Sequence, residues 1–242
     1  MTTTGFEHFW SQGDLITRSV AALLLLMSIS AWVVILWKGW LLRRVNVDLQ
    51  RAVPAFWAAP SLDDGRAQLA AFDRESVLRP LVDAAVTTPP DGTLEARGHV
   101  DSQLTRRLRD ALHRVVGQLQ FGQVLLASIG STAPFIGLFG TVWGIYHALL
   151  SIYTAGAITI ERVSGPVGEA LVMTAAGLAV AIPAVLAYNV FGKRVAASEA
   201  ELEGFAHDLR EMMVRDEGAP TIAAPRGGSA GLGSGPAPVR PA

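Results

Sequence analysis

The hydrophobic residues of this chain gather in three long blocks. The first block, Ser19–Trp37, has 19 residues and no charge. As a helix it covers about 28 Å, close to the hydrocarbon thickness of a bilayer. Two later apolar blocks, Gln123–Tyr153 and Pro166–Phe191, are also long enough to cross. The pattern predicts an all-α membrane protein with three transmembrane helices.

The first block is expected to stay in the mature protein. It is longer than the apolar core of a signal peptide, and the acidic residues Glu7 and Asp14 precede it where a signal peptide carries basic ones. No small-residue cleavage motif follows. Trp37 and Trp40 are typical of the boundary between membrane and water.

The polar stretches predict helices outside the membrane. Between the first two blocks we expect helices over Leu41–Trp57, Asp63–Val86 and Leu94–Val116, separated by Pro-containing turns. After the third block a further amphipathic helix is predicted. Its apolar stripe, at spacings of three and four residues, comprises Leu202, Phe205, Leu209 and Met212.

Charge placement predicts the orientation. Arg18 is the one basic residue before the first block, and several follow it, beginning with Lys38. The Lys193–Arg194 pair follows the third block. Because cytoplasmic flanks of spans are enriched in Lys and Arg, the N-terminus is predicted outside and the C-terminus inside.

These patterns divide the chain into eight predicted segments. In chain order they are a periplasmic N-terminal segment (1–18), transmembrane helix 1 (19–37), a cytoplasmic helical domain (38–122), transmembrane helix 2 (123–153), a periplasmic loop (154–165), transmembrane helix 3 (166–192), a cytoplasmic helix (193–217) and a disordered tail (218–242).

Composition excludes several classes of function. Half of the 242 residues are hydrophobic, 17% are charged and the net charge is −1, so the chain lacks the basic excess of nucleic-acid-binding proteins. There is no cysteine, and the five histidines show no metal-ligand spacing. Ser131 and His147 lie about 24 Å apart along one helix, too far to act as nucleophile and base. We therefore expect no enzyme, no cofactor and no metal.

Small residues recur in the second and third blocks. Gly137, Gly140 and Gly144 superficially resemble a phosphate-binding loop, but neither a predicted strand before them nor a lysine after them supports that interpretation. Close helix packing explains them better, with Gly177 and Ala181 as a matching small face on the third span.

Glu169 lies near the start of the third predicted span, and the 23 residues between it and Lys193 are uncharged. An ionisable group within a span is a candidate functional site. The alternative is structural: if Pro166 begins the helix, Glu169 lies in the first turn, where a carboxylate favours the helix dipole. Position alone leaves both open. An antiparallel pairing of the two spans places Thr141 level with Thr174.

Residues 130–149 (GSTAPFIGLFGTVWGIYHAL) and 165–189 (GPVGEALVMTAAGLAVAIPAVLAYN) resemble the two signature spans of the ExbB/TolQ/MotA proton-channel family, and are most similar to its ExbB members. The resemblance implies a ring, pentameric in the family, around an ExbD-like dimer in the bacterial inner membrane. It also implies that Glu169 is the intramembrane carboxylate and that Thr141 and Thr174 are lumen-lining hydroxyls.

The function implied is a motor subunit driven by the proton-motive force. With an ExbD-like partner it would energise a TonB-like protein for import through outer-membrane receptors, for substrates such as iron siderophores or vitamin B12. Two alternatives remain open: a TolQ-type subunit that powers the Tol-Pal envelope system, and a passive membrane scaffold.

Overall fold

A computed structural model describes the chain except for residues 1–13, 89, 91, 94–98, 156–159 and 219–242. Helices and short connections make up the described part, which contains no strand. The described helices are α2 (Leu15–Trp57), α3 (Leu62–Phe72), α4 (Arg79–Val86), α5 (Val100–Gln120), α6 (Gln123–Ala155) and α7 (Ile160–Gly218).

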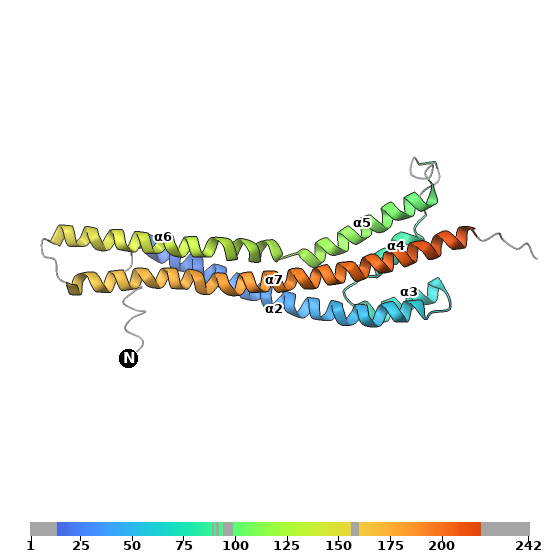
Figure 1. Ribbon diagram of the computed structural model, residues 1–242, viewed down its shortest axis with the longest axis horizontal. Coiled ribbons are helices and arrows are strands. Elements are labelled where there is room, and N and C mark those ends of the chain that lie inside the picture. The colour runs from blue at the N-terminus through green and yellow to red at the C-terminus, as the bar shows by residue number, and fades with distance from the viewer. Residues whose placement is uncertain (1–13, 89, 91, 94–98, 156–159, 219–242) are drawn as a thin grey trace, which may run out of the picture.

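The molecule is elongated, and its two halves differ in composition. In Figure 1, α6 and α7 run side by side through one half, while α3, α4 and α5 surround α2 and α7 in the other. Three helices, α2, α6 and α7, are long and apolar enough to cross a membrane, as the hydrophobic blocks predict. We call the half containing residues 14–37, 123–155 and 160–192 the apolar half, and the half containing the described residues of 38–122 and 193–218 the charged half.

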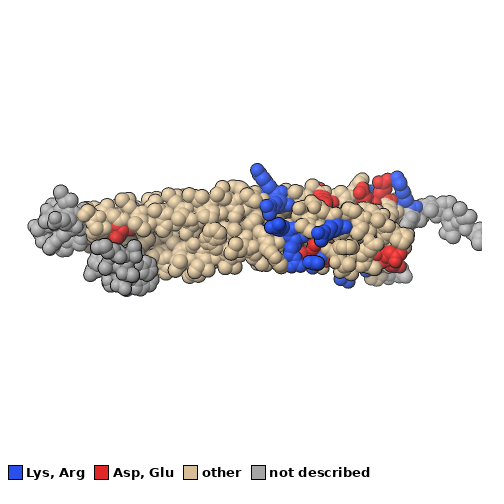
Figure 2. All heavy atoms as spheres, turned by 90° about the horizontal axis from the view of Figure 1, so that it is seen from below, with Lys and Arg blue, Asp and Glu red and all other residues tan. Residues whose placement is uncertain are grey.

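Charge follows this division. On the face shown in Figure 2, Lys and Arg gather near the middle of the long axis, and the apolar half beyond them is almost free of charge. Within the chain, 17% of the most apolar stretch of α2 is buried, against 39% of that of α6. The apolar half therefore leaves most of the apolar stretch of α2 for contact with lipid or with other chains.

Two helices are longer than predicted. The expected span 19–37 and the expected helix Leu41–Trp57 form one unbroken helix of 43 residues, α2, whose Asp14 side chain caps the first turn. Likewise α7 runs for 59 residues and begins at Ile160, so Pro166 lies inside the helix instead of starting it. The predicted connection 154–165 is correspondingly shorter, and its residues 156–159 lie outside the described part.

The single helix predicted over Asp63–Val86 is wrong. The structure has two helices there, α3 and α4, because the buried Asp73 side chain intervenes. Its carboxylate accepts hydrogen bonds from three successive backbone amides, those of Val77, Leu78 and Arg79, at 2.8–2.9 Å. These donors would otherwise be unpaired at the start of α4.

The other helical predictions differ only at their ends. The helix expected over Leu94–Val116 is α5, which begins at Val100 and extends to Gln120, and residues 94–98 lie outside the described part. The predicted tail 218–242 also lies outside it, apart from Gly218 at the end of α7.

One continuous hydrophobic core fills the charged half and extends into the adjoining part of the apolar half, where it includes Ala31, Leu126 and Ala184. The predicted stripe on α7 is confirmed: Leu202, Phe205 and Leu209 are buried, and Met212 packs against the same core. The Phe205 ring meets the Phe56 ring of α2 with centroids 5.1 Å apart. This core fixes α2 and α7 together at one end, while α6 packs along α7 at the other.

Candidate functional site

The contact between α6 and α7 has no room for side chains where glycines face each other. A Cβ atom on Gly137 would lie 2.6 Å from the Met173 carbonyl oxygen, and one on Gly177 would lie 2.6 Å from the Ala133 carbonyl oxygen. Both distances are far inside van der Waals contact. The absence of side chains here lets the two backbones approach closely.

The other small residues continue this contact. A Cβ atom on Gly144 would lie 2.8 Å from the Ala170 Cβ, and one on Gly140 would lie 3.1 Å from both Met173 and Val20. Gly140 therefore lies where α2 meets the α6–α7 pair. Ala181 is 4% exposed and belongs to the small core shared by these three helices.

Thr141 and Thr174 meet inside the α6–α7 contact, and their hydroxyl oxygens are within hydrogen-bond distance of each other. The Thr141 hydroxyl also lies 3.1 Å from the Gly137 carbonyl of its own helix and 3.1 Å from the Ala170 carbonyl of α7. Thr141 is 7% exposed, whereas Thr174 is only partly buried. The pair forms a polar connection across an otherwise apolar contact.

Glu169 lies in the third turn of α7, because the helix begins at Ile160. The interpretation that places it in the first turn is therefore wrong, and pairing with the first turn's free amides does not explain its position. Its partly buried side chain lines a groove of about 830 Å³ between α2 and α7. The groove walls are apolar, apart from Glu169 and Ser28.

Glu169 and Thr174 lie on different sides of α7. Five residues correspond to about 500° of helical rotation, which separates the two side chains by about 140°. Glu169 faces the groove beside α2, and Thr174 faces α6. The structure thus brings the two threonines together and places the carboxylate on the neighbouring side of the same helix.

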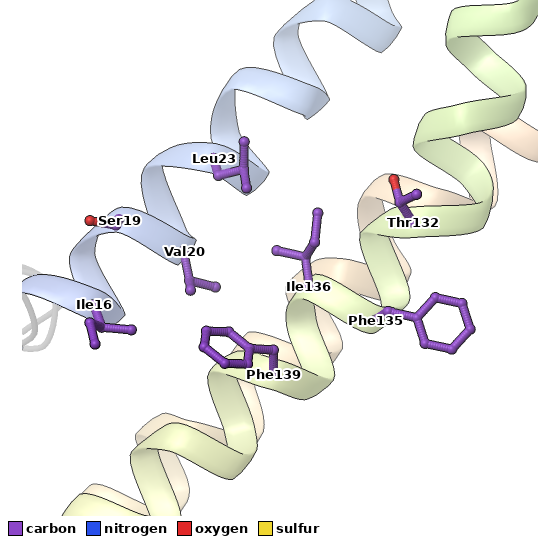
Figure 3. Close-up of a pocket in the computed structure, with 8 residues that line it drawn as sticks. All are labelled: Ile16, Ser19, Val20, Leu23, Thr132, Phe135, Ile136 and Phe139. Atoms are coloured by element: carbon purple, nitrogen blue, oxygen red, sulfur yellow. The ribbon is translucent and has the colours of Figure 1, made fainter.

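A second groove, between α2 and α6, shows what distinguishes the Glu169 groove. Figure 3 shows Val20 and Leu23 of α2 across from Ile136 and Phe139 of α6. This groove has a volume of about 430 Å³, and its lining contains no ionisable residue. Of these two grooves in the apolar half, the one between α2 and α7 contains a group that can bind a proton.

The sequence did not indicate a polar cluster at the N-terminal end of α2. Asp14 accepts a hydrogen bond from Trp143 Nε1 at 3.2 Å and lies 3.6 Å from His147 Nε2. Trp143 and His147 are one turn apart on α6, which is a weak signal by itself. Asp14 is 129 residues away from Trp143, so only the packing of α2 on α6 brings it there.

No metal site accompanies these groups in the described residues, where no three His, Asp or Glu side chains gather. The groups that these contacts provide are the Glu169 carboxylate, the adjacent Asp14 and His147 side chains, and the two threonine hydroxyls between the helices. Such groups can bind, hold and release protons.

Comparison with known proteins identifies the family of the chain. Residues 73–204 match the model of the MotA/TolQ/ExbB proton channel family. The biopolymer transport protein ExbB of Xanthomonas campestris pv. campestris (strain B100) is 38% identical over 228 residues, covering 87% of this chain and 89% of the relative. ExbB of Neisseria meningitidis (strain DSM 15465 / Z2491) is 37% identical over 217 residues, covering 86% and 96%.

A relative with a different name is also similar. The Tol-Pal system protein TolQ of Pseudomonas aeruginosa is 31% identical over 222 residues, covering 85% of this chain and 90% of the relative. The family match covers α4, α5, α6 and most of α7, including Glu169 and both threonines. The chain belongs to the MotA/TolQ/ExbB proton channel family.

Proposed function

We propose that this chain is a motor subunit of the bacterial inner membrane, driven by the proton-motive force. With an ExbD-like partner it energises a TonB-like protein for import through outer-membrane receptors, such as those for iron siderophores or vitamin B12. The proposal is supported by ExbB-named relatives at 37–38% identity over most of the chain. The observation that carries the proton chemistry is Glu169, placed in an apolar groove of a proton-channel family member.

One carboxylate in each chain is not a complete proton route. The hydrocarbon core is about 30 Å thick, far more than a single side chain can cover. Water in a central space, or a titratable group on a partner, has to complete the path. We therefore propose a ring of chains, a pentamer as in the family, around the ExbD-like partner.

Thr141 and Thr174 are proposed to extend the route from Glu169. Their hydroxyls are in contact, and Thr174 is partly exposed on the α6–α7 pair. Thr141, however, has carbonyl acceptors within reach in both helices, which also ties the helices together. Replacing either threonine by Ala is therefore expected to reduce activity less than replacing Glu169.

The test is import in cells that depend on this chain. Glu169→Gln keeps the size of the side chain but removes the exchangeable acid, so TonB-dependent iron uptake should be lost while membrane insertion is unchanged. Glu201→Gln, at an exposed position of the same helix, is the matched control and should import normally. Normal uptake in Glu169→Gln would contradict the proposal.

A TolQ-type role is the second candidate, because TolQ of Pseudomonas aeruginosa is 31% identical over a similar span. Copurification separates the two: ExbD-like and TonB-like partners support the first role, and TolR-like and TolA-like partners support the second. A passive scaffold would assemble a complex without needing an acid at position 169, so normal function of Glu169→Gln would favour it.

A further inference from the structure

Lys38 of α2 is the one fully buried ionisable side chain among the described residues, at 0% exposure. It follows directly after the charge-free stretch of α2, where a lysine would be expected to extend into water. Its Nζ instead donates hydrogen bonds to the backbone carbonyls of Leu119 and Phe121. These acceptors lie more than 80 residues further along the chain.

The two carbonyls lie where α5 stops and α6 starts. Leu119 is in the last turn of α5, Phe121 follows that helix, and α6 begins at Gln123. The last carbonyls of a helix have no partner within it, and a positive charge is favourable there. The Lys38 ammonium meets both requirements.

Gly122 makes this break possible, with a φ of +82° that favours glycine. A Cβ atom at this position would also lie 3.0 Å from the Val34 side chain of α2. The Phe121 ring packs edge-on against Trp37, with ring centroids 6.0 Å apart. Three neighbouring positions of α2, Val34, Trp37 and Lys38, thus contact the break.

The contacts of Lys38 with the break are hydrogen bonds, whereas those of Val34 and Trp37 are apolar. A buried ammonium is unfavourable unless its donors are satisfied, and no acidic side chain of the described residues forms an ion pair with Lys38. The two carbonyls are the hydrogen-bond partners of Lys38. Without this contact, both the ammonium of Lys38 and the two carbonyl oxygens at the break would be buried without a partner. Moving the break away from α2 would leave both sets unpaired.

We propose that Lys38 is a positioning residue that holds the break between α5 and α6 against α2, so that these three helices move as one body. Little of the apolar stretch of α2 is buried against the rest of the chain. Polar contacts at the ends of this stretch therefore contribute to holding α2 against the neighbouring helices. The inference rests on these contacts alone, and holds whichever partner the chain drives.

The test is amide hydrogen exchange, followed by mass spectrometry, on the full chain in lipid nanodiscs. Lys38→Met keeps much of the side-chain volume but removes the donors and charge. It should speed exchange of the amides of residues 119–126 about tenfold or more, because the break opens more often. Lys193→Met, which removes an exposed lysine from α7, should leave this exchange unchanged.

Rescue separates hydrogen bonding from simple packing. Lys38→Arg retains charge and donors, and its exchange at residues 119–126 should stay within about threefold of the wild type. Exchange as fast as in Lys38→Met would overturn the assignment to donated hydrogen bonds. Unchanged exchange in Lys38→Met, or an equal rise along the whole chain, would overturn the proposal itself.

A further variant covers the case in which Lys38→Met does not accumulate in the membrane. Trp37→Ala removes the adjacent ring contact and leaves Lys38 in place. If Lys38 holds the break, exchange at residues 119–126 stays within about threefold of the wild type. A tenfold rise would assign the break to the ring contact and overturn the role of Lys38.

Discussion

Asp73 shows how one side chain separates two helices. It is 5% exposed, and its carboxylate accepts hydrogen bonds from three backbone amides at the start of α4. Asp73→Ala is expected to lower the free energy of unfolding by about 2 kcal/mol, because these amides lose their acceptor inside the protein. Thermal unfolding in detergent measures this. Asp110→Ala, at an exposed position of α5, should change little, and equal stability of the two variants would contradict this role.

Residue contacts were predictable only where the pairing of elements was known. An antiparallel arrangement of two adjacent spans is enough to place Thr141 level with Thr174, and their hydroxyls are in contact. In the sequence, Lys38 looks like an ordinary basic residue that flanks a membrane span. Its partners are backbone carbonyls, which every residue has, so no sequence pattern identifies them. The Asp14 cluster likewise depends on how α2 crosses α6.

At the scale of elements, the α6–α7 contact depends on glycine at specific positions. Gly177→Ala would place a Cβ atom 2.6 Å from a carbonyl oxygen of α6, so the helices have to separate. The expected loss of stability is about 1–3 kcal/mol. Gly168→Ala is the matched control on α7, because a Cβ atom there meets no atom within 4 Å. Thermal unfolding of the two variants compares them, and an equally stable Gly177→Ala would contradict this packing.

Helices α5 and α7 are joined by an ion pair in the charged half. Arg210 donates hydrogen bonds at 2.7 and 2.8 Å to the two oxygens of Asp101, and these bonds hold the pKa of the Asp101 carboxyl below its usual value of 3.8. A carboxyl with a lowered folded-state pKa contributes stability above its unfolded pKa. That contribution is lost as the pH falls through the folded-state pKa.

This sign predicts a pH dependence. The contribution of the pair should be constant from neutral pH down to about pH 5 and should decline below the usual carboxyl pKa. Asp101→Asn removes that part of the decline. Melting temperatures of both proteins between pH 7 and pH 3 test this, and identical pH dependence would show that the pair contributes nothing.

Whole helices were predictable to the extent that one pattern runs through them. Long apolar blocks identified α2, α6 and α7, and the stripe from Leu202 to Met212 identified the buried face of α7. The continuation of α2 and α7 beyond their predicted membrane spans was not predictable. A charged segment following a span looks like a boundary, although the helix continues through Lys38 and through Lys193. The break at Asp73 depends on its backbone contacts, whereas the hydrophobic spacing on both sides remains helical.

At the scale of the whole molecule, the orientation is a prediction from the positions of Lys and Arg. The chain has no cysteine, so single cysteines report accessibility directly. Tyr153→Cys, at an exposed position near the end of α6, should react with an impermeant maleimide in spheroplasts with intact inner membranes. Thr88→Cys, exposed after α4, should react only after the membrane is opened. The opposite pattern would reverse the orientation.

The apolar half also leaves much hydrophobic surface uncovered, including most of the apolar stretch of α2. Lipid covers such surface in a single chain, and neighbouring chains cover part of it in the proposed ring. Glu169 lies in a groove that opens on this surface. In the proposed ring, the surroundings of Glu169 would include groups from neighbouring chains.

Proton flux through the assembled complex tests the central proposal most directly. The chain and its ExbD-like partner are reconstituted in liposomes, a pH gradient and membrane potential are imposed, and internal pH is followed with a dye. Wild type and Glu201→Gln should conduct protons equally, and Glu169→Gln should reduce the flux at least about tenfold, because the exchangeable acid is lost. Flux through Glu169→Gln equal to that of the wild type would contradict the assignment of Glu169 to the proton route.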